Sequence, residues 1–457
     1  MKTPLWQALS AHVAQAPFST HTPGHKSGQL IPAALIDAWG EAVWHYDLTE
    51  VPGLDNLAHP EGVLKESMAE WAHERECAYV QYLLGGTSLG LKAAILGLCR
   101  GQEVFVPRHA HGSIYQGLVL AGATPIPLDV TFDPQLDIPV GVDPEVFQEA
   151  LCCNPDCRTM VMVHPTYHGI TGENETLLQM AHAYGVTTIV DAAHGAHFTS
   201  DVTPKSALAM GADVVIESAH KILPCLTQAS VMLIRDAALV EPLRAAVGLL
   251  HTTSPSYLLM ASLEAAGAWL AEEGDAVMRD GLRQISLLEA GLAGNPHLNV
   301  ARNPTWKQDP FKIYLTSPHA GGEAISEALA EHGVTAEMSD GRGCLLMMPL
   351  DGGSPALHEA VLAAAHDLAA VTTDCPRPCY SKSRPETVVP LSEAWLAPRQ
   401  TKPLCEAVGD VCAAIIEAYP PGIPLLLPGQ RITEQMLQAW TESGRDANAP
   451  VDVLITG

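Results

Sequence analysis

Short β-branched apolar runs alternate with Ala- and Leu-rich stretches through the middle of the 457-residue chain. Apolar runs of four to six residues, bounded by glycine, proline or polar residues, are typical of strands buried in a parallel sheet. The longer stretches between them predict helices that connect one strand to the next, and therefore an α/β domain with a mostly parallel sheet. Strands are predicted over residues 79–84, 103–106, 124–128, 159–163, 187–190, 213–216 and 229–234, and a helix over 89–99.

The pattern changes near residue 300, where a second, smaller α+β domain is predicted. A long Ala/Leu-rich segment, 257–292, should be helical and lead into it. A Pro-, Cys- and Ser-rich stretch, 372–403, predicts an extended connection. Further predicted elements are strands over 312–315 and 344–348 and helices over 324–332 and 354–370. We therefore expect three parts: an N-terminal segment over 1–60, a large domain over 61–300 and a small domain over 301–457.

Composition narrows the class of protein. The formal net charge of −26 argues against binding to nucleic acid and to anionic membrane surfaces. The N-terminus has no apolar segment of the kind found in secretory signals, and no apolar run reaches membrane-spanning length. Eleven cysteines are scattered without paired zinc spacing. These features predict a cytoplasmic protein with reduced thiols and no metal site.

Two polar residues at the ends of neighbouring predicted strands indicate the chemistry. Asp191 follows the run 187–190, and Lys221 comes shortly after the run 213–216. Ligands of open α/β sheets bind at the carboxyl ends of the strands, so both side chains can face one crevice. Pyridoxal phosphate (PLP) needs a lysine amine for its Schiff base and an acid to keep its pyridine nitrogen protonated. Taken singly, Asp191 could instead cap a helix and Lys221 could reach solvent.

Two further segments fit the same cofactor. Residues 85–88, Gly-Gly-Thr-Ser, lie between a predicted strand and helix, where backbone N–H groups and hydroxyls can hold a phosphate. A glycine turn with a serine cap would look the same. His111 follows the next strand and could stack on a flat heterocycle, or bond to its own loop. A phosphate turn, a ring stacker, an acid and a lysine after successive strands together favour a PLP enzyme.

A metal-dependent hydrolase is the alternative from another class. The chain has twenty histidines, and the pairs His109/His111 and His194/His197 lie near candidate site residues. No HExxH-type helix is present, however, and a hydrolase would leave Lys221 without a role.

Specific runs of sequence extend the interpretation to nearly the whole chain. They are HTPGHK at 21–26, RHAHGS at 108–113, DAAHGAHF at 191–198, SAHKILPCLTQ at 218–228, TTSPSYLLMASL at 252–263 and YPPGIPLLLPG at 419–429. With these runs the chain resembles the Orn/Lys/Arg decarboxylase family, PLP enzymes of fold type I related to the aspartate aminotransferases. The early position of the TPGHK motif resembles the short form of the family, without an N-terminal wing domain.

The resemblance implies a role for each candidate residue. Lys221 would carry PLP, Asp191 would pair with the pyridine nitrogen, His111 would stack on the ring, and His194 would support Asp191 or the ring oxygen. The phosphate would be held by Gly86, Thr87, Ser88, Ser218 and His220, with Thr253 and Ser254 reaching a phosphate in the neighbouring subunit. The resemblance also implies a homodimer or a dimer of dimers, with active sites at the interface and a contribution from residues 1–60.

The implied reaction is decarboxylation of a basic amino acid to its amine and CO2. Arginine is the first choice, with lysine and ornithine as the others, and Asp47, Glu50 and Asp55 are candidates to meet the distal cation of the substrate. The chain departs from the usual family residues at Gly112, Ala192, Ala219, Ile222 and Gln430. These departures keep three alternatives open: a decarboxylase of an unusual amino acid, a PLP-dependent lyase or cyclase, and a catalytically silent regulatory homologue.

Overall fold

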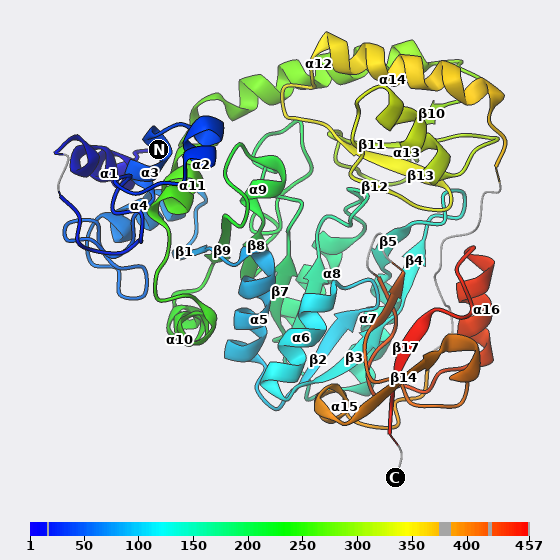
Figure 1. Cartoon of the computed structure of the whole chain (residues 1–457). Helices are drawn as coiled ribbons and strands as arrows, with labels where there is room; N and C mark the ends of the chain where they lie inside the picture. The colour runs from blue at the N-terminus through cyan, green and yellow to red at the C-terminus, as the bar shows by residue number, and fades with distance from the viewer. Residues whose placement is uncertain (16–17, 374–384, 419–422, 456–457) are drawn as a thin grey trace. The chain divides into compact units, whose positions relative to one another are not determined.

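The computed structural model describes residues 1–15, 18–373, 385–418 and 423–455 (Figure 1). The chain forms two compact units, each assembled from separate stretches of sequence. The first unit comprises Met1–Leu98, Ile189–Ser200 and Lys205–Asp275, and the second comprises Cys99–Thr188, Asp201–Pro204 and Ala276–Gly457. The three-part division at residues 60 and 300 stays a prediction.

The main sheet has seven strands in the order β1-β9-β8-β7-β6-β2-β3. Its strands are β1 (Tyr79–Leu83), β2 (Glu103–Pro107), β3 (Thr124–Leu128), β6 (Thr159–Val163), β7 (Thr187–Asp191), β8 (Val214–Glu217) and β9 (Ser230–Ile234). Strand β7 is parallel to β8, and β2 is parallel to both β3 and β6. Strand β9 runs antiparallel to β1 and β8. The predicted α/β fold with a mostly parallel sheet is therefore confirmed.

In the first unit, helix α5 lies close against the sheet. A Cβ on Gly90 would come within 2.5 Å of the Leu83 side chain and 2.7 Å of Ile216 on β8, so glycine permits this approach. Helix α10 packs on α5. The helices of this unit are α1 (Pro4–Ala14), α2 (Ala33–Trp39), α3 (Ala42–Tyr46), α4 (Val63–Glu74), α5 (Gly86–Leu98), α9 (Ala219–Ile222), α10 (Val240–Leu250) and α11 (Tyr257–Trp269).

Besides the strands β6, β2 and β3 of the main sheet, the second unit contains a separate small antiparallel sheet. Its strand order is β10-β11-β13-β12. Its strands are β10 (Asn299–Val300), β11 (Lys312–Thr316), β12 (Met338–Ser339) and β13 (Gly343–Met347), and helix α12 (Asp275–Leu292) precedes it. Helix α13 (Gly322–Glu331) packs against β13 and against α14 (Pro355–Asp367) (Figure 1). The smaller α+β part is therefore present.

The remaining elements of the second unit are short. Two antiparallel pairs are β4 (Val130–Phe132) with β5 (Pro139–Val142) and β15 (Ile416–Ala418) with β16 (Ile423–Leu426). Strand β14 (Arg399–Pro403) pairs with β17 (Pro450–Leu454). The helices are α6 (Gly112–Ala121), α7 (Pro144–Cys153), α8 (Asn174–Ala183), α15 (Leu391–Leu396) and α16 (Glu434–Glu442).

One prediction in this region is wrong. The stretch 372–403 was expected to be an extended connection, but within its described part it contains helix α15 and strand β14. Leu391 and Ala394, three residues apart, are buried on one face of the helix, and Pro390 immediately precedes it. Because a short apolar stripe is easily hidden in a proline-rich stretch, composition alone pointed to a connection.

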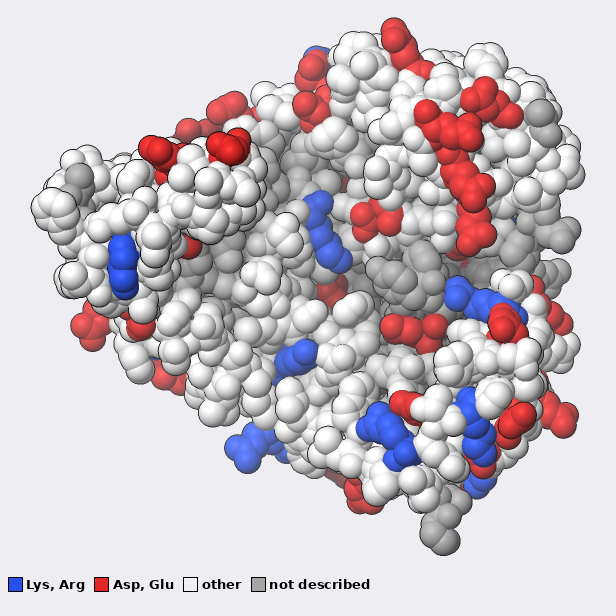
Figure 2. Space-filling view, in the orientation of Figure 1, with Lys and Arg blue, Asp and Glu red and all other residues white. Residues whose placement is uncertain are grey.

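The surface carries an excess of acid. Figure 2 shows aspartate and glutamate side chains gathered over the region of the small sheet and α13, in keeping with the net charge of −26. In the part of the chain that the structure describes, no helix is long and apolar enough to cross a bilayer.

Candidate active site

The acid and the lysine meet the same edge of the sheet, as predicted. Asp191 is the last residue of β7 and pairs in register with Ile216 of the parallel strand β8. Lys221 lies on the short helix α9, four residues beyond the end of β8. Asp191 is buried, and its Oδ1 accepts a hydrogen bond from Ala193 N at 3.1 Å. The parallel pairing thus brings the two segments together at the carboxyl ends of both strands, where ligands bind in such sheets.

The amine of Lys221 faces an imidazole. Its Nζ lies 3.0 Å from Nε2 of His194, which is buried in the turn after β7. A lysine amine and an imidazole nitrogen at this distance can share one proton, because only one of the two needs to hold it. His194 therefore contacts the lysine directly. Its predicted support for Asp191 or the ring oxygen stays a prediction.

A set of hydroxyl groups gathers at the start of α5. The helix begins at Gly86, whose φ of +68° favours glycine, and not at residue 89 as predicted. The earlier start puts Thr87 and Ser88 in the first turn, where the helix dipole attracts anions. Thr87 Oγ1 is hydrogen-bonded to Ser218 Oγ, and both residues are buried. Two of the predicted phosphate ligands, from segments 131 residues apart, are thus brought together.

The remaining predicted phosphate ligands are arranged differently. His220 is oriented by a hydrogen bond from Nδ1 to the carbonyl of Ala229, at 3.0 Å. Thr253 and Ser254 lie exposed in the loop between α10 and α11. Among the described residues neither bonds to the hydroxyls of Thr87 or Ser218. Their predicted contact with a phosphate of a neighbouring subunit stays a prediction.

His251 was not found from the sequence, although it directly precedes the 252–263 run. Its Nε2 accepts a hydrogen bond from Leu84 N at 3.1 Å, and its Nδ1 donates to Thr252 O at 3.2 Å. Burial lowers the pKa of this imidazole, against a smaller opposing effect of the bond to Thr252. The neutral ring thereby ties the loop that contains Thr253 to the residue before the phosphate turn.

His111 belongs to the second unit and caps helix α6. Its Nδ1 accepts from Ser113 N at 3.2 Å and lies 2.8 Å from Ser113 Oγ, and the residue is exposed. Next to it, a Cβ on Gly112 would lie 3.8 Å from Oε2 of Glu417. Burial raises the pKa of Glu417, whereas the nearby His111 lowers it. Ring stacking by His111 stays a prediction. Gly112, which replaces a lysine usual in the family, lies next to the carboxylate of Glu417.

His109, the neighbour of His111 in the hydrolase alternative, is a neutral core residue. Both ring nitrogens are buried without a hydrogen-bond partner in the described structure, although part of the residue surface is exposed. Burial lowers its pKa to about 4. Across residues 1–15, 18–373, 385–418 and 423–455, no three His, Cys, Asp or Glu side chains cluster as metal ligands would.

The three carboxylates suggested for the substrate cation are engaged with their own chain. Asp55 accepts from the backbone N–H groups of Gly62 at 2.7 Å and Leu64 at 3.2 Å, at the start of α4. Burial raises its pKa, but backbone hydrogen bonds outweigh this and hold the pKa below its usual range. Asp47 accepts from Ser256 Oγ at 3.1 Å, and Glu50 accepts from the side chain of Asn56 at 2.8 Å. Their role toward substrate stays a prediction.

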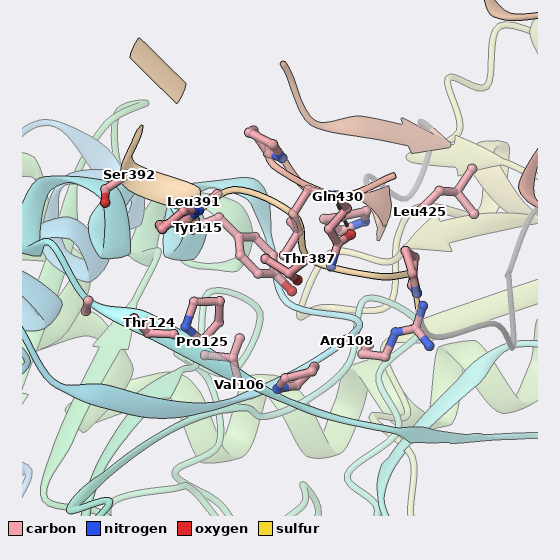
Figure 3. A pocket seen from close by; sticks show the side chains of 17 residues that line it. Val106, Arg108, Tyr115, Thr124, Pro125, Thr387, Leu391, Ser392, Leu425 and Gln430 are labelled. Carbon is pink, nitrogen blue, oxygen red and sulfur yellow. Dashed lines mark hydrogen bonds between the residues drawn. The ribbon is translucent and has the colours of Figure 1, made fainter. Parts of the chain in front are cut away.

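A cavity of about 290 Å³ lies in the second unit and contains none of the predicted site residues (Figure 3). Proline and leucine side chains make up much of its wall, and Figure 3 shows Tyr115 reaching toward Thr387. The cation on its wall, Arg108, is paired with Asp129 at 3.5 Å. This cavity lacks the amine, carboxylate and hydroxyl set that the first unit provides.

The groups of the first unit fit PLP. Lys221 supplies an amine, Asp191 a buried carboxylate at a strand end, and Thr87 and Ser218 hydroxyls at a helix N-terminus. Space is available beside the turn, because a Cβ on Gly86 would meet no atom within 4 Å. A basic amine, an acid and a phosphate-binding turn are the donor set that this cofactor requires.

Comparisons with known proteins identify the family. The family described as Orn/Lys/Arg decarboxylase, major domain, matches residues 3–293. The chain is 33% identical to the uncharacterized protein YaaO of Bacillus subtilis, over 96% of this chain and 93% of that protein. It is 30% identical to an arginine decarboxylase of Bacillus anthracis, over 98% and 94% of the two chains.

Solved structures show the same fold. Lysine decarboxylase A of Pseudomonas aeruginosa superimposes with a TM-score of 0.86 at 19% identity, over 99% of this chain and 80% of that chain. The Francisella novicida lysine decarboxylase LdcF gives 0.85 at 18% identity, over 99% and 81%. The fold is that of the fold-type-I PLP enzymes, and the chain is a member of the Orn/Lys/Arg decarboxylase family of PLP-dependent enzymes.

Proposed function

We propose that this protein binds PLP through Lys221 and decarboxylates a basic amino acid, with arginine as the first choice. The observation that carries the proposal is the placement of the Lys221 amine, 3.0 Å from His194 Nε2 and at the same sheet edge as Asp191. The choice of arginine rests on the relatives that are named arginine decarboxylases at 30–31% identity over nearly the whole chain.

Each residue has a task derived from its position. When bound, PLP supplies an electron sink for the electron pair that remains on Cα after CO2 leaves. The buried carboxylate of Asp191 keeps a proton on the pyridine nitrogen, because an unpaired charge there would be costly. Thr87 and Ser218 hold the phosphate and so fix the ring in place. Lys221 Nζ and His194 Nε2 are close enough to pass a proton between them, which makes them the candidates to return one to Cα.

The proposal extends to substrate, assembly and location. The net charge of −26 and the acidic surface in Figure 2 suit a cationic amino acid. The exposed Thr253 and Ser254 suit a contact with the phosphate site of a second subunit, and so a homodimer or a dimer of dimers. We also propose a cytoplasmic location.

A change of substrate within the same scaffold is the second candidate. Gly112 stands where the family usually has lysine, and a side chain at this position would point toward Glu417. A negative charge in place of a positive one next to the predicted ring stacker would favour a different amino acid or a different PLP reaction.

The test is CO2 release and amine formation by PLP-loaded protein with arginine, lysine and ornithine in parallel. We expect strong release with one of them and none from a Lys221→Ala variant. Lys65→Ala, which alters an exposed lysine on α4, is the control and should match the wild type. Bound PLP without release from any of the three would refute basic amino acid decarboxylation and direct the search to another PLP reaction or a silent homologue.

A further inference from the structure

Arg75 and Glu217 form a buried ion pair beside the candidate active site. Arg75 is the residue that follows α4, and its side chain is 6% exposed; the Glu217 side chain is 2% exposed. The guanidinium donates one hydrogen bond from Nη2 to Glu217 Oε1. Its other terminal nitrogen, Nη1, donates to the backbone carbonyl of Ala196 at 3.4 Å. One side chain therefore bonds to two segments that are distant in sequence.

Those two segments are the ones that hold the reactive groups. Glu217 ends β8, directly precedes Ser218 and lies four residues before Lys221. Ala196 lies two residues after His194, in the turn that follows β7. The contact of Lys221 Nζ with His194 Nε2 at 3.0 Å also joins these two segments. Movement of either segment would change this contact.

Stability alone does not account for such a pair. Removing two charges from water is expensive, and apolar residues of similar volume often stabilise a fold as well or better. In addition, Glu217 Oε2 is buried without a hydrogen-bond partner in the described structure. Arginine carries its donors on separate nitrogens of a rigid planar fork, whereas lysine has a single terminal nitrogen. The geometry uses this property, since Nη1 and Nη2 bond to different segments.

The opposite end of the same strand offers a comparison. Asp213, directly before β8, pairs with Arg235, directly after β9, at 2.7 Å. This pair is 13% and 44% exposed and lies at the end of β8 away from Lys221. It also joins an arginine to a carboxylate at an end of the same strand, but it holds no candidate site segment.

We propose that Arg75 and Glu217 are positioning residues, which clamp the turn that carries Lys221 to the turn that carries His194. This rests on the proposed PLP function of Lys221. The pair touches neither reacting atom: it sets the distance between the lysine amine and the imidazole. Loss of the clamp should lower kcat by about tenfold to a hundredfold with KM changed less than about threefold, because misplacement of a reacting group by about 1 Å has an effect of this size.

Three variants test the clamp in the PLP-loaded protein. Arg75→Lys keeps the charge but replaces the planar fork with one ammonium nitrogen, so we expect it to lose at least one of the two bonds. Glu217→Gln keeps an acceptor and removes the charge, so its effect should be smaller. The double change Arg75→Met with Glu217→Leu removes both charges, and we expect it to fold with near wild-type stability while the lysine remains misplaced. Asp213→Asn is the matched control at the far end of β8.

Two measurements report the positions of the segments that carry Lys221 and His194. The first is the pH midpoint of the absorbance of PLP bound to Lys221, recorded without substrate; we expect a shift in all three variants and none in the control. The second is hydrogen exchange of residues 192–198 and 218–222, which we expect to become faster in both segments together. Wild-type spectra and exchange in Arg75→Lys, or equal changes in Asp213→Asn, would overturn the proposal. Exchange needs neither cofactor nor turnover, so it tests the clamp even if the proposed reaction fails.

Discussion

Two lysines of this chain, one in each unit, differ in burial and in the group that lies beside the amine. Lys312, on β11 of the second unit, is 1% exposed, whereas Lys221, on α9 of the first unit, is only partly buried. Lys312 donates to the backbone carbonyl of Tyr167 and lies 5.2 Å from the centre of the Tyr167 ring. Lys221 faces the Nε2 of His194. Burial alone therefore does not distinguish the lysine proposed to bind PLP from Lys312, and the two lysines also differ in the contacts of their amines.

The surroundings of Lys312 fit a structural role. A backbone carbonyl cannot give up or take a proton near neutral pH, whereas an imidazole can. Near Lys312 on the same sheet, the Tyr314 hydroxyl donates to Asp340 Oδ1 at 2.6 Å, and the His168 ring lies edge-on to the Tyr314 ring. These contacts hold strand β11 and the loop after β6 in fixed positions. The contact between Lys221 and His194 can in addition move a proton.

The largest expected effect is the loss of turnover when Lys221, and not Lys312, is replaced. Lys221→Ala should reduce turnover by about 10³-fold or more, because the amine proposed to carry the cofactor is lost. Its unfolding midpoint should stay close to that of the wild type. Steady-state decarboxylation and thermal unfolding of the same preparations measure this, and turnover that survives in Lys221→Ala would break the comparison.

A smaller loss is expected when the acid at the sheet edge is made neutral. Asp191→Asn should lower kcat by about a hundredfold, since the pyridine nitrogen would lose the charge proposed to hold its proton. The counterpart in the second unit, Asp340→Asn, should leave turnover per folded molecule unchanged. Steady-state kinetics of both variants, measured in parallel, check this. Equal losses of kcat in the two variants would contradict the prediction that only the carboxylate at the sheet edge serves the reaction.

Lys312→Met should affect stability and leave the chemistry intact. The change keeps the length of the side chain but leaves the Tyr167 carbonyl without its donor, at a cost of about 1–3 kcal/mol in the free energy of unfolding. Denaturant unfolding measures the loss, and retained cofactor with retained turnover per folded molecule is expected. A stability equal to that of the wild type would mean that the lysine is not structural.

The smallest expected effect is a difference in how the local stability depends on pH between the loop that contains His251 and the small sheet near Asp340. Burial lowers the pKa of His251, so the folded loop favours the neutral imidazole. This stabilisation is present above the usual histidine pKa of about 6.5 and is lost as the pH falls below that value. Burial raises the pKa of Asp340, but bonds from His168, Tyr314 and Arg342 outweigh this and lower it. The stabilisation from Asp340 is therefore kept above about pH 4 and lost below it.

Hydrogen exchange, corrected for intrinsic rates, distinguishes the two pH windows. Residues 251–254 should loosen between pH 7 and 5, while β11 and β13 stay protected until about pH 4. His251→Gln should remove the first transition and leave the second. Loosening of both regions at the same pH would contradict the two assignments.

The strand ends were predictable because parallel pairing depends on local apolar runs. The runs ending before Asp191 and Glu217 gave β7 and β8 to within one residue, and with them the relative places of the acid and the lysine. The start of α5 was predicted three residues late, because Gly86 and Thr87 are poor helix formers in isolation. Only the tertiary structure shows that this first turn is anchored by the bond between Thr87 and Ser218.

The supporting contacts of the site were not predictable from one sequence. Arg75 meets Glu217 across 142 positions, and Leu84 meets His251 across 167. No local pattern marks such pairs, since none of these residues stands out within its own segment. The same limit applied to Lys312, whose burial depends on the loop that contains Tyr167.

The most direct test of the account is to locate the cofactor on the chain. PLP-loaded protein is reduced with borohydride, digested and analysed by mass spectrometry for the modified lysine. The account predicts the pyridoxyl group on Lys221 alone, with none on Lys312, and no modification in the Lys221→Ala variant. A group on any other lysine, or no covalent cofactor in a protein that decarboxylates, would contradict it.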